Sequence, residues 1–256
     1  MSVIAASDLI HRSTFIIRSY EIDPHKIASA PALVRIMQEA SMEHVLRLQL
    51  SVWDLEPRGL SWVLMRQRLH FSRLPRLGET VEIITHPSAF ERVFTHRDYH
   101  MYDAEGQEIA HASTTWLLMQ TTTRRMSRIP ADMLAYNELL PDSATHLARA
   151  AEILPESGAV LHSIRFIIHW FDLDFNFHLT NSKYVEWLLA SADEDLLRHA
   201  TLQDMEVHYL AECKLGEEVI SETALEHKNT RMHRLVRVSD GKELAKARSV
   251  WTMLQV

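Results

Sequence analysis

The strongest constraint on the fold is an internal repeat, because three segments of the first half match three segments of the second half without gaps. The pairs are YEIDPHKIASAPALVRIMQEA from Tyr20 with FDLDFNFHLTNSKYVEWLLAS from Phe171, LGETVEI from Leu77 with LGEEVIS from Leu215, and GQEIAHASTTWLLM from Gly106 with GKELAKARSVWTML from Gly241. They occur in the same order in both halves. Two copies are too few for a solenoid, so the repeat predicts two similar domains packed together.

Each half is predicted to contain a strand or extended segment, then one helix, then several strands. Apolar residues recur at helical spacing from Arg35 to Leu48, where Pro31 suits the first turn, and again from Asn181 to His199. The second helix is expected to bury Tyr184, Leu188, Ala192 and Leu196. Strands are expected at Leu60–Phe71, Thr80–Pro87, Arg92–Tyr102 and Glu108–Thr121, then at His162–Trp170, Leu202–Glu212, Glu217–Glu226, Arg231–Val238 and Glu243–Thr252. This order predicts α+β units whose antiparallel sheets wrap around the helices.

The boundaries of the units follow from the repeat and from the residues between its copies. Residues 1–130 are predicted to form the first unit and residues 161–256 the second. Residues 131–160 combine prolines with mixed polar residues, which is typical of a linker with a short helix or two.

The composition excludes several classes of protein. A single cysteine excludes a disulfide scaffold and a Cys-rich zinc site, and the six glycines are too dispersed for a phosphate-binding loop or a nucleophile elbow. A net charge of −7 argues against a general nucleic-acid binder. His96 and His100 share a strand face, but no HExxH motif appears, so no metal and no other cofactor is expected. With no leader pattern and no membrane span, we expect a cytoplasmic protein.

The segment Asp174 to Leu179 carries the best candidate for chemistry. Polar Asp174, Asn176 and His178 alternate with apolar residues, so an extended backbone would place the three polar side chains on one face. The segment leads into the second helix, where Thr180, Asn181 or Ser182 can cap the first turn and backbone N–H groups can stabilise an oxyanion. The alternative is an ordinary loop in which Asp and Asn side chains form turns.

The corresponding segment of the first half lacks this chemistry. It keeps Asp23 but has Lys26 and Ala28 where the second half has Phe177 and Leu179, and it has no equivalent Asn or in-register His. We therefore predict a division of labour in which one copy reacts and the other mainly binds.

A second candidate lies at Glu212 and Cys213. Neighbours on a strand face opposite ways, so both cannot address one site without a bulge, and a nucleophilic role for Cys213 is disfavoured. A buried Glu near His and Asp would be a credible general base, because burial raises the pKa of a carboxyl.

Basic and apolar residues elsewhere suggest binding surfaces. Two arginine clusters could dock an acidic partner or simply be solvated. One consists of Arg66, Arg68, Arg73 and Arg76, and the other of Arg124, Arg125 and Arg128. Met37, Trp62, Met65 and Trp187 fit a core better than a pocket, although some must line a cavity if an acyl chain binds.

Several segments carry a family resemblance: FIIRSYEID, RIMQEA, WVLMRQRLHFSRLPRLGETVEI, HRDYHMYDAEGQEIAHASTTWLLMQTTTRR and, most specifically, DLDFNFHLTNSKYVEW. Over nearly the whole chain they resemble the acyl-ACP thioesterase family. The resemblance implies two tandem hotdog units packed as a pseudo-dimer. It also implies that Asp174, Asn176, His178 and Glu212 are catalytic, although Thr180 stands where the family commonly has Asn.

The resemblance further implies hydrolysis of fatty acyl thioesters carried by acyl carrier protein. The first unit would hold the acyl chain, with Met37, Trp62 and Met65 as candidate contacts, and Arg124, Arg125 and Arg128 would dock the acidic carrier. A hotdog enoyl-thioester hydratase and a non-catalytic acyl-thioester binder are the alternatives, although the hydratase motif has a proline and an extra residue that this chain lacks. The chain is expected to be a monomer or a homodimer.

Overall fold

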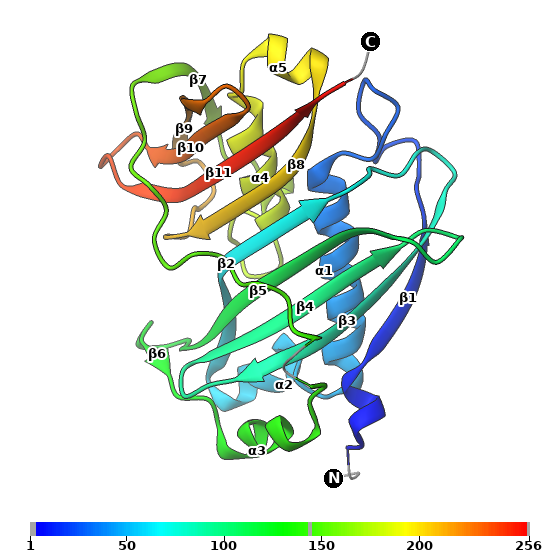
Figure 1. Cartoon of the computed structure of the whole chain (residues 1–256). Coiled ribbons are helices and arrows are strands. Elements are labelled where there is room, and N and C mark those ends of the chain that lie inside the picture. The colour runs from blue at the N-terminus through cyan, green and yellow to red at the C-terminus, as the bar shows by residue number, and fades with distance from the viewer. Residues whose placement is uncertain (1–3, 143–144, 255–256) are drawn as a thin grey trace. The chain divides into compact units, whose positions relative to one another are not determined.

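The computed structural model describes residues 4–142 and 145–254 and divides the chain into two units. The first unit takes in Met1–Gln67 and Ser72–Ala150, and the second takes in Arg68–Phe71 and Ala151–Val256. Each unit consists of antiparallel strands with a helix packed on them, as Figure 1 shows, so the predicted α+β class is confirmed.

In the first unit, α1 packs against β1 and β3 of a sheet whose strand order is β1-β3-β4-β5-β2, with β6 paired to β5. The β1–β3, β3–β4 and β4–β5 pairs are antiparallel. The elements are η1 (Ala6–Leu9), β1 (His11–Ile16), α1 (Ala30–Arg47), α2 (Val52–Leu55), η2 (Glu56–Arg58), β2 (Leu60–Phe71), β3 (Thr80–Phe90), β4 (Phe94–Tyr102), β5 (Glu108–Gln120), β6 (Met126–Ser127), α3 (Ala131–Leu134) and η3 (Ala135–Leu139).

Helix α1 begins earlier than the expected Arg35, because Ser29 caps it and Pro31 occupies its first turn. The Ser29 hydroxyl accepts a hydrogen bond from the Ala32 N–H at 3.4 Å. Leu33, Met37 and Ala40 are fully buried along the helix. A second apolar cluster joins Leu48, Leu50 and Leu55 to residues of η1, β2, β3, β5 and α3 (Leu9, Leu60, Phe90, Leu118, Met133) and to Ile129.

In the second unit, α4 packs against β9, β10 and β11 of a sheet whose strand order is β8-β11-β10-β9-β7. Each neighbouring pair in this order is antiparallel. The elements are β7 (Val160–Ile167), η5 (Trp170–Asp172), α4 (Asn181–Ala190), α5 (Glu194–His199), β8 (Ala200–Tyr209), β9 (Glu218–His227), β10 (Thr230–Arg237) and β11 (Glu243–Met253).

The two strand orders correspond element by element, which confirms the duplication. The strand order of the first unit is β1-β3-β4-β5-β2, and that of the second unit, taken from β7, is β7-β9-β10-β11-β8. Strands at the same place in these two orders are equivalent. The repeat aligns Ala112 of β5 with Ala247 of β11. Each alanine pairs with a residue of the equivalent neighbouring strand, Tyr99 of β4 and His233 of β10, so the registers of the two strand pairs agree as well.

The prediction of one helix from Asn181 to His199 is wrong, because the chain breaks between α4 and α5. Asp193 accepts a hydrogen bond from the Leu196 N–H at 3.0 Å and so caps α5. Its other carboxylate oxygen lies 2.8 Å from the buried Arg231 guanidinium of β10. The residues predicted to be buried, Tyr184, Leu188, Ala192 and Leu196, are all buried nonetheless.

Replacing Asp193 with Ala should lower the free energy of unfolding by about 3 kcal/mol, because the change removes a helix cap and the carboxylate beside a buried guanidinium. Urea titration followed by circular dichroism measures the loss. The matched control is Asp195→Ala on the same helix, whose pair with His199 is exposed and whose loss should be about 0.5 kcal/mol or less. Equal losses in the two variants would contradict this account of the helix break.

Candidate active site

The segment from Leu173 to Leu179 forms a tight turn, so the extended backbone expected for it is wrong. Leu173 and Leu179 form a bridge across the turn, the Asp174 N–H donates to the His178 carbonyl at 2.8 Å, and the Phe177 N–H donates to the Asp174 carbonyl at 3.0 Å. Phe177 lies in the left-handed region with a φ of 61°. Side chains in such a turn do not alternate, so no shared strand face brings Asp174, Asn176 and His178 together.

The Asp174 carboxylate holds the turn together. Its Oδ1 atom accepts hydrogen bonds from the N–H groups of Asn176 at 2.8 Å and His178 at 3.2 Å. An aspartate that accepts the N–H two residues ahead forms an Asx turn, as in the alternative that the sequence left open. Thr180 then caps α4 by accepting from the Lys183 N–H at 3.4 Å, which fixes where the helix begins.

The first unit contains the same turn. The Asp23 carboxylate accepts from the His25 N–H at 2.9 Å, and Lys26, with a φ of 63°, takes the left-handed position of Phe177. The backbone of Asp23 makes the same pair of hydrogen bonds, from its N–H to the Ile27 carbonyl and from the Lys26 N–H to its own carbonyl, both at 2.9 Å. The turn is therefore part of the duplicated scaffold.

Glu212 lies in the connection after β8, because that strand ends at Tyr209 and not at Glu212 as predicted. The N–H groups of Leu210 and Ala211 both donate to the Leu244 carbonyl, which interrupts the ladder. The connection brings Oε2 of Glu212 to 3.1 Å from Nε2 of His178. About 30% of the Glu212 side chain and 25% of the His178 side chain remain exposed, so the expected burial of the glutamate is only partial.

Three hydrogen bonds hold the backbone on either side of Glu212. The Tyr184 hydroxyl donates to the Ala211 carbonyl at 2.8 Å, the Arg237 guanidinium donates to the Glu212 carbonyl at 2.9 Å, and the Leu179 N–H donates to the Cys213 carbonyl at 3.1 Å. Burial raises the pKa of Tyr184, so its hydroxyl keeps the donated proton. Sequence reasoning missed Tyr184 and Arg237 as supports, because only the fold brings them to this loop.

The first unit has no counterpart of the His178–Glu212 pair. The Ala28 N–H donates to the Pro75 carbonyl, just as the Leu179 N–H donates to the Cys213 carbonyl, so Pro75 corresponds to Cys213. The residue before each of these is therefore equivalent, and the first unit has Leu74 where the second has Glu212. It likewise has Ile27 at the place of His178. A carboxylate and an imidazole therefore meet on one copy of the turn, and two apolar side chains occupy the other.

Cys213 is fully buried beneath this site. Its Sγ atom lies 3.1 Å from the Tyr184 hydroxyl, and burial raises the pKa of the thiol to about 11. The argument from opposite strand faces does not hold in a loop, but burial and the raised pKa independently disfavour a thiolate nucleophile.

The candidate acyl-chain contacts lie in the first unit. Met37 is fully buried on α1, while Trp62 and Met65 on β2 are partly buried. Trp62 packs against the second apolar cluster and donates its indole N–H to the Leu50 carbonyl at 2.9 Å.

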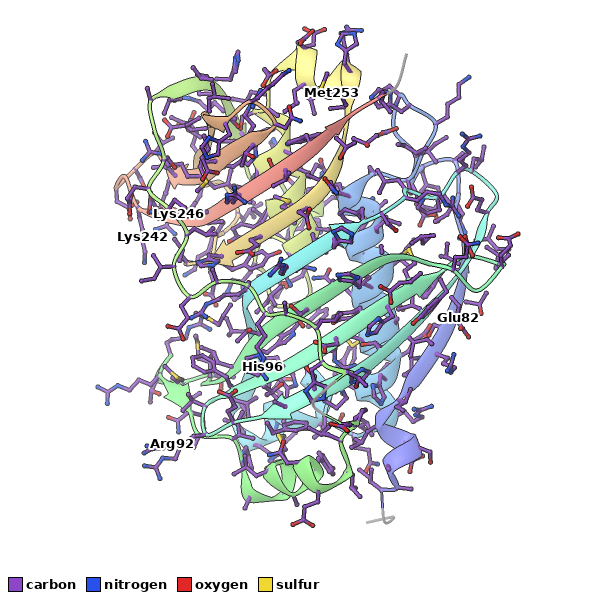
Figure 2. All side chains as sticks on the ribbon, viewed as in Figure 1. Glu82, Arg92, His96, Lys242, Lys246 and Met253 are labelled. Carbon is purple, nitrogen blue, oxygen red and sulfur yellow. The ribbon has the colours of Figure 1, made fainter. Side chains whose placement is uncertain are left out.

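The cluster of Arg124, Arg125 and Arg128 is exposed on the connections that flank β6. Arg92, which the sequence analysis does not single out, lies at the same end of the unit, because its carbonyl accepts a hydrogen bond from the Ile129 N–H. Its side chain is exposed as well. Figure 2 shows the Arg92 side chain projecting away from the hairpin between β3 and β4. We name these four arginines the β6 arginine cluster.

The other arginine stretch is partly neutralised. Arg73 lies 2.7 Å from Glu79 and 3.1 Å from Asp103, and Arg68 lies 3.7 Å from Glu206. Within residues 4–142 and 145–254, no group of three or more His, Cys, Asp and Glu side chains is arranged to hold a metal ion. Among the same residues, no helix has the length and apolar character needed to cross a membrane.

Family models match both halves of the chain. The model described as the acyl-ACP thioesterase N-terminal domain matches residues 8–136, and the model described as the C-terminal domain matches residues 158–253. A palmitoyl-acyl carrier protein thioesterase of Cuphea hookeriana is 31% identical over 97% of this chain. The chain spans only 63% of the length of that relative.

Solved structures show the same architecture over nearly the whole chain. The 12:0-ACP thioesterase from Umbellularia californica superposes with a TM-score of 0.85 at 25% identity, covering 96% of this chain and 98% of the other. A putative oleoyl thioesterase from Lactobacillus plantarum gives a TM-score of 0.83 at 24% identity, covering 96% and 97%. The prediction of two tandem hotdog units is thereby confirmed, while the pseudo-dimeric packing of the units stays a prediction.

The thiol of Cys213 should react slowly in the folded chain, because it is buried and its pKa is raised to about 11. At pH 8 such a thiol is about 0.1% thiolate, against roughly a quarter for an ordinary cysteine, so labelling by a disulfide reagent should be about 100-fold slower than after unfolding in urea. Cys213 is the only cysteine, so the signal is unambiguous. Equal rates in the folded and unfolded chain would show that the thiol is accessible and reactive.

Proposed function

The chain belongs to the acyl-ACP thioesterase family, and we propose that it hydrolyses fatty acyl thioesters of acyl carrier protein to the free fatty acid and the carrier thiol. The observation that supports the proposal best is the 3.1 Å approach of His178 to Glu212 on one copy of a duplicated turn. A carboxylate and an imidazole within hydrogen-bonding distance can orient a water molecule and accept its proton.

We assign the role of general base to Glu212. The Oδ1 atom of Asp174 already accepts two backbone N–H groups, which suits Asp174 to positioning. The carboxylate of Glu212 takes a proton from water, whose oxygen attacks the thioester carbonyl carbon. The tetrahedral intermediate then releases the thiolate as the carbon–sulfur bond breaks, and the sulfur receives the proton that Glu212 took from the water, which restores the carboxylate.

The remaining groups of the turn stabilise this reaction. His178, 3.1 Å from Glu212, orients the carboxylate in the site. Asn176 and the N–H groups at the start of α4 are assigned to the carbonyl oxygen, because donors aimed at the developing negative charge lower the barrier most. Cys213 takes no covalent part.

The substrate is assigned to two further regions of the first unit. The acyl chain is assigned to the side of α1, with Met37, Trp62 and Met65 as candidate contacts, where each buried methylene contributes about 0.8 kcal/mol. The acidic carrier is assigned to the β6 arginine cluster, because four exposed arginines gather at that end of the first unit. The monomeric or homodimeric state and the cytoplasmic location stay predictions.

The Glu212→Gln and His178→Ala variants should each lower kcat for thiol release by about 100-fold or more and change KM little, because the lost contacts are made mainly in the transition state. Release of the carrier thiol from a panel of acyl carriers is the measurement. The Cys213→Ala variant is the control and should keep activity within about threefold of the parent chain. A loss in Cys213→Ala equal to that in Glu212→Gln would restore a thiol mechanism.

The same assay tests the reaction class. An enoyl thioester that gained water while the thiol stayed bound would identify a hydratase, and the absence of turnover on every acyl carrier would identify a binding protein. Either outcome would overturn the proposed function.

Reversing Arg124, Arg125 and Arg128 to Glu should raise KM for carrier-bound substrate by about 10-fold and weaken its dependence on salt, because charge pairing drives the encounter with an acidic partner. A short soluble acyl thioester without a carrier should keep its KM in this variant. The matched control is Arg66→Glu with Arg76→Glu. If the control raised KM and the β6 variant did not, docking would belong to the other stretch.

A further inference from the structure

Four exposed aromatic side chains lie within the turn of the second unit or just before it in the chain. Trp170, Phe171, Phe175 and Phe177 have 58%, 93%, 56% and 63% of their surfaces exposed, and we name them the aromatic rim. The rings of Trp170 and Phe177 pack edge to face with centroids 5.9 Å apart. Exposed Phe side chains forgo the stabilisation that burial would give them, so their clustering here indicates a ligand.

The first unit provides an internal comparison for the rim. Its equivalent turn has Ser19, Tyr20, Pro24 and Lys26 at the four positions. Tyr20 is exposed as well, but its hydroxyl accepts a hydrogen bond from Arg18 at 3.1 Å and so tolerates water. The same backbone therefore forms without the other three aromatic rings, and folding does not require them.

Phe177 gives the sharpest form of this argument. It occupies the left-handed position of the turn, where bulky residues are outliers and where the first unit has Lys26 at nearly the same φ. Phe177 also directly precedes His178, whose ring meets Glu212. Because the first unit has nearly the same φ at Lys26, the strain belongs to the turn, and it is the exposed ring beside the His178–Glu212 pair that indicates a functional contact.

The rim presents no unpaired carboxylate from its own segment. Asp172 accepts from the His169 N–H at 2.9 Å and lies 3.7 Å from the Lys183 ammonium, and Asp174 accepts from the N–H groups of its own turn. The exposed rings form an apolar surface, which fits an uncharged ligand and does not complement an acidic protein. Its exposure also suits a ligand that crosses the surface, since a bound acyl tail is better held in an enclosed pocket.

We propose that the aromatic rim binds the neutral, thiol-bearing arm of the acyl thioester, the chain of methylenes and amides on the sulfur side of the reacting carbonyl. This inference rests on the proposed function, which assigns the thioester carbonyl to Asn176 and the N–H groups at the start of α4. The rings of Trp170 and Phe177 form one wall along the arm, and Phe171 extends that wall towards solvent. The rim thus contributes to KM for substrates with a full arm and not to the bond-breaking step.

The test compares thioesters of one acyl chain on two thiols, coenzyme A with the full arm and N-acetylcysteamine with a truncated arm. The Phe177→Lys variant adopts the residue that the first unit carries in the same turn, so the backbone tolerates it. We expect KM for the coenzyme A thioester to rise about 10-fold while kcat and the KM for the truncated thioester change less than twofold. The reciprocal Lys26→Phe variant is the matched control and should change neither KM.

A second variant, Phe171→Ser, alters a side chain that is almost wholly exposed and so keeps the test valid if Phe177→Lys unfolds. It should raise KM for the coenzyme A thioester about threefold and leave the truncated thioester unchanged. An equal rise for both thioesters would place the contact on the acyl side and overturn the proposal. So would unchanged KM values for both thioesters combined with weaker sedimentation of the variants with phosphatidylcholine vesicles, which would identify a lipid surface.

The failure of this inference is distinguishable from the failure of the proposed function. If the parent chain releases thiol from both thioesters but the rim variants do not separate them, only the assignment of the rim is wrong. If the parent chain releases thiol from neither thioester nor from any acyl carrier, the proposed hydrolysis is wrong.

Discussion

The hydrogen bonds from backbone N–H groups to the Asp174 carboxylate are the interaction on which the site depends. A hydrogen bond to a charged group contributes about 1.5–3 kcal/mol, which can offset the cost of about 1–2 kcal/mol for placing Phe177 in the left-handed region. With the turn fixed, Thr180 begins α4 at a set position and the Leu179 N–H reaches the Cys213 carbonyl. The loop that carries Glu212 is thereby tied to the turn that carries His178.

Much of the fold could be predicted because its signals are local. The strand from Leu60 to Phe71 has the bounds that the sequence predicts, since an apolar run behind a turn glycine at Gly59 marks such a segment. The break between α4 and α5 could not be predicted in the same way. The capping Asp193 is stabilised by Arg231, 38 residues further along the chain, and periodicity carries no information about such a partner.

The sequence points to the candidate site partly for the wrong physical reason. The alternation of Asp174, Asn176 and His178 predicts one strand face, whereas the structure brings the segment together as a turn organised by Asp174 itself. From the residues alone, Glu212 is a credible general base only if a histidine lies close to it in the fold. The family resemblance is what names Glu212 and His178 together as catalytic residues. Its position depends on Tyr184 and Arg237, which lie 28 and 25 residues away in the sequence and become neighbours only when α4 packs on its sheet.

The duplication separates what the scaffold needs from what the reaction needs. Both units have the turn aspartate, a residue in the left-handed region and a hydroxyl that caps the helix. In both, the N–H of the residue before the cap also donates a hydrogen bond to the loop that follows a later strand. The fold accounts for these shared features. Folding does not account for a histidine and a glutamate in place of Ile27 and Leu74, because the apolar pair serves the same backbone without the cost of desolvating polar groups. The polar pair in the second unit is therefore not explained by the folding of the turn, which is what the proposed division of labour between the units expects.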